Sequence, residues 1–106
     1  MARDYYALGG TPAGEPCAQV GKDEYYERMR KETKAYIGQL QRMFPDGPDG
    51  AFFKRKTFPH DFGDYHEVCL IFDSDDESHC EYMHKIDTEL PEYWDKEAKQ
   101  ELGIID

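Results

Sequence analysis

The segment from Ala51 to Asp73 restricts the fold of this chain more than any other. It contains most of the phenylalanines and the one long uncharged apolar run, Val68 to Phe72. Two stretches rich in β-forming residues flank the short loop Pro59–Gly63, a pattern typical of two antiparallel strands joined by a hairpin. The first strand carries Lys54, Arg55 and Lys56 and is expected at the edge of the sheet, because cationic side chains discourage pairing with a second sheet.

Periodic apolar residues predict a long helix from Asp23 to Phe44, which Pro45 ends. Its apolar positions recur at steps of three and four: Tyr26, Met29, Thr33, Tyr36, Ile37, Leu40, Met43 and Phe44. A second helix is expected from about Asp75 to Glu89, after a capping box formed by Ser74 and Glu77. Its inward residues would be Cys80, Met83, Ile86 and Leu90.

A third helix is predicted to begin at Pro91 and to end at Gly103, with Trp94, Ala98 and Leu102 on one face. Tyr5–Leu8 could form a short strand at the edge of the hairpin, and a further short strand could form at 103–105. A small antiparallel sheet covered on one face by about three helices is an α+β fold, and a ferredoxin-like arrangement is the most specific topology that fits this order.

The length of 106 residues fits one domain. Residues 1–21 are rich in glycine and proline and are expected to form a loop-rich N-terminal arm that contains the short strand. Residues 22–106 would form a single α+β domain.

The negative charge is concentrated in the C-terminal third. The net charge is −10, and residues 73–106 carry −9 of it, from twelve acidic residues and three lysines. Such a field repels phosphate backbones and anionic membranes, so we expect no direct binding to nucleic acid or to a membrane, and it favours a basic partner. No apolar run is long enough to cross a bilayer, and the N-terminus lacks the apolar core of a signal peptide, so a cytoplasmic location is expected.

The sequence contains no recognisable catalytic signature. Cys17, Cys69 and Cys80 cannot all pair within one chain, and Cys69 has the surroundings of a buried apolar residue. No phosphate-binding loop is present, so we expect neither an enzyme nor a cofactor. The alternative is a small metal-dependent enzyme that uses His60 and His66, since possible ligands lie close by in the sequence: Asp61, Asp64, His79, Cys80 and His84.

Two surfaces are candidates for binding a protein. The hairpin loop presents Phe58, His60, Asp61, Phe62 and Tyr65, whose aromatic rings either pin the loop to the helices or anchor a partner. The second surface holds the acidic residues that begin the second helix: Asp75, Asp76, Glu77 and Glu81. These acids could imitate a nucleic-acid backbone toward a basic protein that handles nucleic acid, or they could form an ordinary solvated face. A homodimer is a further alternative, in which the strand Lys54–Lys56 meets an acidic helix of its twin.

Two segments resemble those of a family of small uncharacterised proteins encoded by bacteriophages and prophages: Pro16-Cys17-Ala18-Gln19-Val20-Gly21 and the stretch from Phe58 to Val68. The resemblance extends to the helix between them and to Leu90-Pro91-Glu92-Tyr93-Trp94-Asp95. The resemblance implies a bacterial host cytoplasm and an accessory role, with no catalytic residue to transfer. The combined expectation is a non-enzymatic, acidic protein-binding module that inhibits a host or defence protein.

Overall fold

The computed structural model describes residues 3–8, 11–12, 22–59 and 65–104. The described elements are β1 (Asp4–Ala7), α1 (Lys22–Met43), β2 (Phe52–Phe58), β3 (Tyr65–Phe72), α2 (Glu77–Thr88) and α3 (Lys96–Leu102). This order confirms the predicted α+β class. A ferredoxin-like topology is not found, because the described strands form one three-stranded antiparallel sheet, and residues 103–104 are not in a strand.

The sheet has β3 at its centre and the order β1-β3-β2. The hairpin of β2 and β3 pairs Phe58 with Tyr65 at one end and Phe52 with Ile71 at the other. On the opposite side of β3, Tyr5 of β1 also pairs with Ile71. The expected edge position of β2 and the short N-terminal strand are therefore both confirmed. Within the apolar run of β3, Val68, Leu70 and Phe72 alternate toward the core, and Cys69 between them is also buried.

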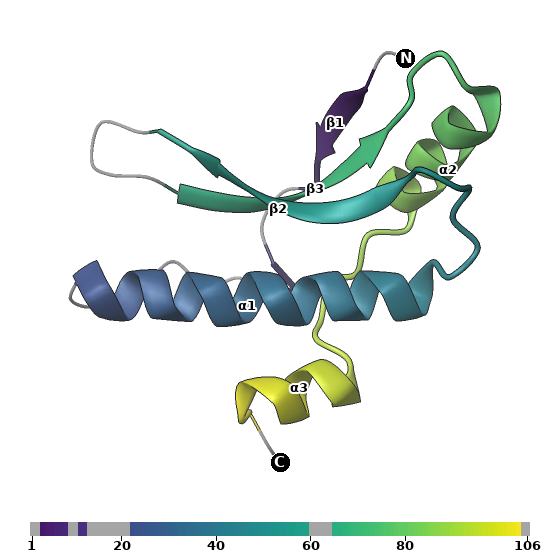
Figure 1. Ribbon diagram of the computed structural model, residues 1–106. Helices are drawn as coiled ribbons and strands as arrows, with labels where there is room; N and C mark the ends of the chain where they lie inside the picture. Colours follow the sequence, from purple (N-terminus) through teal and green to yellow (C-terminus); the bar gives the residue numbers. More distant parts are fainter. Residues whose placement is uncertain (1–2, 9–10, 13–21, 60–64, 105–106) are drawn as a thin grey trace.

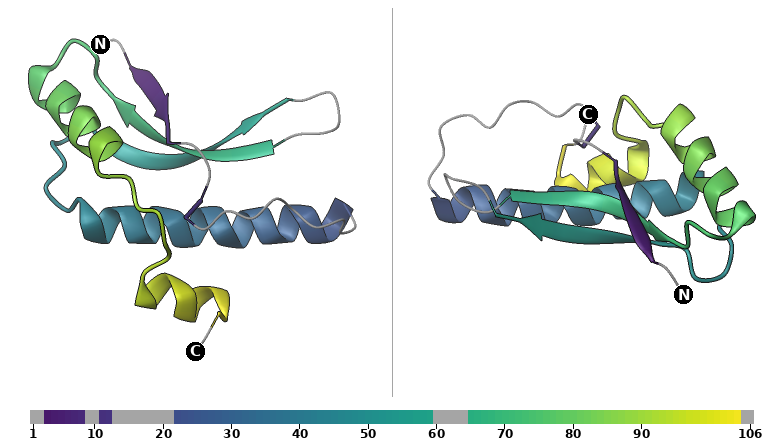
Figure 2. Two further views of the ribbon diagram at one scale, coloured as in Figure 1. Left: turned by 180° about the vertical axis from the view of Figure 1, so that it is seen from behind. Right: turned by 90° about the horizontal axis from the view of Figure 1, so that it is seen from above.

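The helices form layers that differ from the predicted single cover (Figures 1 and 2). The long helix α1 runs beneath one face of the sheet, and α2 lies at the end of the sheet where β3 ends. The short helix α3 packs on α1, on the side away from the sheet. The expectation that all three helices cover one sheet face is thus wrong for α3. None of the described helices combines the length and apolar character of a bilayer-spanning segment.

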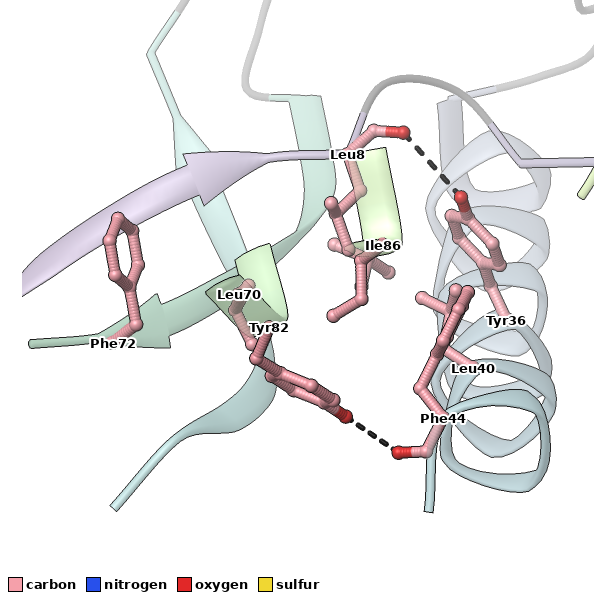
Figure 3. Packing of buried hydrophobic residues seen from close by; sticks show 9 residues of the cluster. Leu8, Tyr36, Leu40, Phe44, Leu70, Phe72, Tyr82 and Ile86 are labelled. Atoms are coloured by element: carbon pink, nitrogen blue, oxygen red, sulfur yellow. Dashed lines mark hydrogen bonds between the residues drawn. The ribbon is translucent and has the colours of Figure 1, made fainter. Parts of the chain in front are cut away.

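The core lies between α1, the inner face of the sheet and α2 (Figure 3). It contains Leu8, Tyr36, Leu40, Phe44, Val68, Leu70, Phe72, Tyr82 and Ile86. Both buried tyrosines use their hydroxyl groups: Tyr36 donates to the carbonyl oxygen of Leu8 at 3.5 Å, and Tyr82 donates to that of Phe44 at 2.6 Å. Burial raises the pKa of Tyr36 to about 12. Leu8, which follows β1, is therefore part of the same core as the helices.

The start and the inner face of α2 differ from the prediction. The residue that caps α2 is Asp76, whose side chain accepts a hydrogen bond from the backbone N–H of Ser78 at 2.9 Å. The predicted capping box at Ser74 is wrong, because residues 73–76 first form a turn closed by a hydrogen bond from Asp76 N–H to the carbonyl oxygen of Asp73. The helix therefore begins later, and its buried residues are His79, Tyr82 and Ile86. Cys80, Met83 and Leu90 are only partly buried against the core.

The third helix also begins later than predicted, at Lys96 instead of Pro91. Asp95 caps it by accepting a hydrogen bond from Ala98 N–H at 2.8 Å. Trp94 precedes the helix and packs edge-on against the ring of Tyr36, with 6.3 Å between the centroids. Gly103 ends the helix as predicted, with a φ of 75° that favours glycine.

Candidate docking surface

The predicted hairpin-loop site falls largely outside the described residues. This applies to His60, Asp61 and Phe62, while Tyr65 is the first residue of β3. Phe58 is half-buried at the end of β2, and its ring lies 6.0 Å from that of Tyr5, centroid to centroid. Phe58 therefore belongs to a cluster on the sheet that includes the N-terminal strand.

The predicted acidic residues at the start of α2 are exposed, and one of them has a structural role. Asp75, Asp76, Glu77 and Glu81 all face solvent. The hydrogen bond from the Ser78 hydroxyl is the largest of the effects that lower the pKa of Asp76. As the helix cap, this carboxylate is needed by the fold itself.

The C-terminal acids do not form one continuous surface. Helix α2 lies at one end of the sheet, whereas α3 lies beyond α1 (Figure 1). At α3, Arg42 forms ion pairs with Asp95 at 2.8 Å and with Glu97 at 3.3 Å. Near the other end of α2, Asp87 accepts a hydrogen bond from the hydroxyl of Tyr6. The −9 charge that is contiguous in sequence is thus divided and partly neutralised in the fold.

Two of the described histidines, His66 and His79, contact the fold itself, whereas the third, His84, is exposed on α2. His66 Nδ1 lies 2.8 Å from the hydroxyl of Thr57, and its ring packs edge-on against Tyr26. The buried His79 accepts a hydrogen bond at Nδ1 from the backbone N–H of Asp73, so Nε2 carries the proton and donates to the carbonyl oxygen of Asp49.

Among the described residues, no three histidine, cysteine, aspartate or glutamate side chains converge on a possible metal position. His60 lies outside these residues, so a metal site formed by His60 and His66 stays a prediction.

One face of the sheet is not covered by any described helix (Figures 1 and 2). Because directly paired residues of neighbouring strands share a face, the register places Tyr5, Phe52 and Ile71 together there. Tyr5 is 51% exposed and Phe52 is 44% exposed. We call this surface the open face, and its side chains in β1, β2 and β3 include Tyr5, Phe52, Lys54, Lys56, Phe58, Glu67, Cys69 and Ile71.

Cationic groups lie over the exposed aromatic rings of the open face. The amino group of Lys56 is 3.8 Å from the centroid of the Tyr5 ring. The guanidinium of Arg3 lies 5.7 Å from the Phe52 ring centroid and donates a hydrogen bond to the carbonyl oxygen of Gly50. Cation–π contacts hold long cationic side chains in place at modest free-energy gain. The open face therefore presents ordered aromatic rings together with positive charge.

Cys69 lies beneath this face and is fully buried, as predicted. Burial, with a smaller contribution from Glu67, raises the pKa of its thiol. A thiol with a raised pKa is protonated at neutral pH and is a poor nucleophile. The open face is thus suited to contact and not to thiol chemistry.

A second feature adjoins the free edge of β2. A groove of about 410 Å³ lies between α1 and β2 and is lined by Arg30, Thr33, Lys34, Ile37 and Arg55. Arg30 lies 3.7 Å from a carboxylate oxygen of Glu27, so its charge is partly compensated. Four other cations along this edge form no ion pair with any described residue: Lys34, Lys54, Arg55 and Lys56. In a chain with 23 acidic residues, this edge is a local positive surface.

A larger groove, of about 630 Å³, lies between α1 and the end of α3. Its rim contains Glu24, Glu27, Arg28, Lys31 and Glu32, and its apolar lining is Leu102 and Ile104. Three acidic and two basic side chains line this groove, and Arg28 bonds to Glu32 at 3.0 Å. The charges of this groove are therefore largely compensated, in contrast to those along the edge of β2.

The cations of β2 are evident in the sequence, but the surface that they help to form is not. Lys54, Arg55 and Lys56 indicate protection of an edge strand or contact with an acidic helix of a second copy. The contributions of Arg3 and Tyr5 from the N-terminal segment, and of Lys34 from α1, depend on tertiary packing. The alternation of β2 does place Phe52, Lys54, Lys56 and Phe58 on one face, and this was the signal available in the sequence.

No protein-family model matches the chain, and comparisons with curated proteins and with solved structures find no match either. The resemblance to bacteriophage proteins therefore stays a prediction, and the functional argument depends on the geometry of this chain.

Proposed function

We propose that this chain is a non-catalytic protein-binding module that contacts its partner through the open face of the sheet. The observation that carries the proposal is the pair of large exposed rings, Tyr5 and Phe52, on a sheet face that no described helix covers. Aromatic residues are enriched at the energetic centres of protein interfaces, because each ring buries a large area at small entropic cost. A partner that covers these rings would gain most of its binding free energy there.

The chemistry of the described side chains supports contact over catalysis. The buried Cys69 thiol has a raised pKa, and both nitrogens of His79 form hydrogen bonds to the backbone. The acidic residues of α2 and α3 are divided between two sides of the molecule, which favours the open face over a single acidic mimic of nucleic acid. Following the resemblance to phage proteins, we propose a host or defence protein as the class of partner.

A binding selection tests the proposal. Fragments of bacterial proteins displayed on a surface would be selected on the purified full chain and then measured one by one. Each binder would be titrated against the wild type, the double variant Tyr5→Ser/Phe52→Ser and the control Tyr93→Ser. Tyr93 is 73% exposed and precedes α3, so the control removes an exposed ring away from the open face.

We expect binders that lose at least about tenfold in affinity on the double variant, since truncating an interface aromatic typically costs more than about 1 kcal/mol. The same binders should bind Tyr93→Ser as they bind the wild type. Binders with the same affinity for the double variant as for the wild type would contradict the proposed surface. A selection that enriches no specific binder would contradict the proposed function.

A further inference from the structure

We infer that the free edge of β2 receives an extended acidic segment of the partner protein, which adds to the sheet as a fourth strand. This inference rests on the proposed function and names the chemical class of its partner. It follows from two observations: the unpaired edge and the cations on both sides of that edge.

The edge is available in the described sheet. Strand β2 spans seven residues and pairs only with β3, so the backbone groups on its other side have no strand partner among the described elements. Such a row of N–H and C=O groups binds extended peptides by strand addition, in which main-chain hydrogen bonds supply affinity and alternate side chains supply specificity.

The cations flank both sides of the strand that would be added. Successive side chains of a strand point to opposite faces, so Lys54 and Lys56 line the open face while Arg55 points toward α1. On that side, Arg55 lines the groove together with Lys34 and Arg30. An added strand would alternate in the same way. Its acidic side chains would therefore meet cations on either face, and three consecutive acids would match Lys54, Arg55 and Lys56.

The alternative explanation of these cations is that they protect the edge of β2 against aggregation. Such protection requires charge on the strand, but it does not require a groove with further cations beside the strand. Here the charge continues beyond β2 to Lys34 of α1, across a groove with a volume of about 410 Å³. This arrangement favours a ligand over simple protection. A protein segment is favoured over a nucleic acid because a polyphosphate would face the net charge of −10, whereas a short acidic peptide carries fewer charges and can complete the ladder of backbone hydrogen bonds.

Synthetic peptides test the inference. The probe is a capped peptide of seven residues, the length of β2, with three central glutamates flanked by threonine and valine. The first control replaces the glutamates with lysines. The second keeps the glutamates but carries N-methyl groups on successive amides, which block strand pairing on both edges of the peptide and leave its charge unchanged. An oligothymidylate with the same number of phosphates as glutamates tests nucleic acid. Calorimetry gives each affinity, and hydrogen exchange reports on the β2 amides.

The matched protein variants reverse the same amount of charge at two places. Lys34→Glu/Arg55→Glu acts at the edge, and Lys85→Glu/Lys96→Glu acts on α2 and α3. We expect the acidic peptide to bind, to slow exchange of the β2 amides, and to lose at least about tenfold in affinity on the first variant and less than about twofold on the second. Melting curves check folding, and Lys34→Gln/Arg55→Gln serves if the charge reversal unfolds the chain.

Several results would overturn the inference. Equal affinity of the N-methylated peptide would exclude strand addition, and equal affinity of the lysine peptide would exclude selection for acidic residues. Tighter binding of the oligothymidylate than of the peptide would identify a nucleic-acid surface instead. The proposed function is tested separately from the inference. If selected binders depend on Tyr5 and Phe52 but are neither acidic nor sensitive to the edge variant, the open face binds protein and only the edge assignment is wrong.

Discussion

At the scale of single residues, Gln39 is the side chain that joins α1 to the segment before α3. It is 2% exposed, and its amide donates to the carbonyl oxygen of Tyr93 at 3.0 Å while its oxygen accepts from the backbone N–H of Asp95 at 3.0 Å. The apolar pattern of α1 does not reveal Gln39, because a glutamine in a helix usually faces water. Its partners lie 54 and 56 residues away, so only the packed structure reveals the contact.

Replacing Gln39 with alanine should lower the free energy of unfolding by about 1–3 kcal/mol, because two backbone groups lose their partners in a partly buried place. Denaturant titration measures this change. Gln41→Ala is the matched control, since Gln41 is exposed on the same helix and should change stability by less than about 0.5 kcal/mol. Equal effects of the two substitutions would show that Gln39 does not hold the C-terminal segment.

At the scale of elements, the hairpin and the long helix could be predicted because their signals are local and repeated. β-Forming residues around a short loop indicate β2 and β3, and apolar residues at helical spacing indicate α1. The starts of α2 and α3 could not be predicted as well. The turn at 73–76 moves the cap of α2 from Ser74 to Asp76, and the contacts of Asp95 with Arg42 and Gln39 place the start of α3 after Pro91.

The cap of α3 predicts a dependence on pH. Partial burial alone would raise the pKa of Asp95, but hydrogen bonds from Arg42 and from Ala98 N–H outweigh burial and lower it. A carboxylate whose pKa is lower in the folded state stabilises the protein above its unfolded pKa, and this stabilisation is lost as the pH falls. At pH 7, Asp95→Asn should be less stable than the wild type by about 0.5 kcal/mol, because the ion pair is partly exposed.

The difference between wild type and Asp95→Asn should shrink as the pH falls below about 3.9, the ordinary pKa of aspartate. Thermal unfolding between pH 7 and pH 3 measures it. The control is Glu92→Gln, which also removes one carboxylate charge, from an exposed residue three positions before Asp95. The stability difference between this control and the wild type should not change with pH in this way. A difference for Asp95→Asn that stays constant down to pH 3 would show that the carboxylate charge does not stabilise α3.

At the scale of the whole molecule, charge counted along the sequence differs from charge displayed on the surface. The sequence predicts an acidic C-terminal surface that attracts basic partners, and the fold divides these acids between α2 and α3. The positive edge, by contrast, is assembled from β2 and α1, and Arg3 adds positive charge to the open face. Lys34 and Arg55 are 21 positions apart in the sequence and line one groove, so no local pattern could reveal it.

Hydrogen exchange of the chain with and without its tightest selected binder tests the central claim most directly. If the partner docks on the open face and along the free edge of the sheet, amides of β2 and β1 should be protected, and those of α2 and α3 should be unchanged. Protection confined to the start of α2, around Asp75 to Glu81, with none in β2, would contradict the claim and restore the acidic helix as the binding surface.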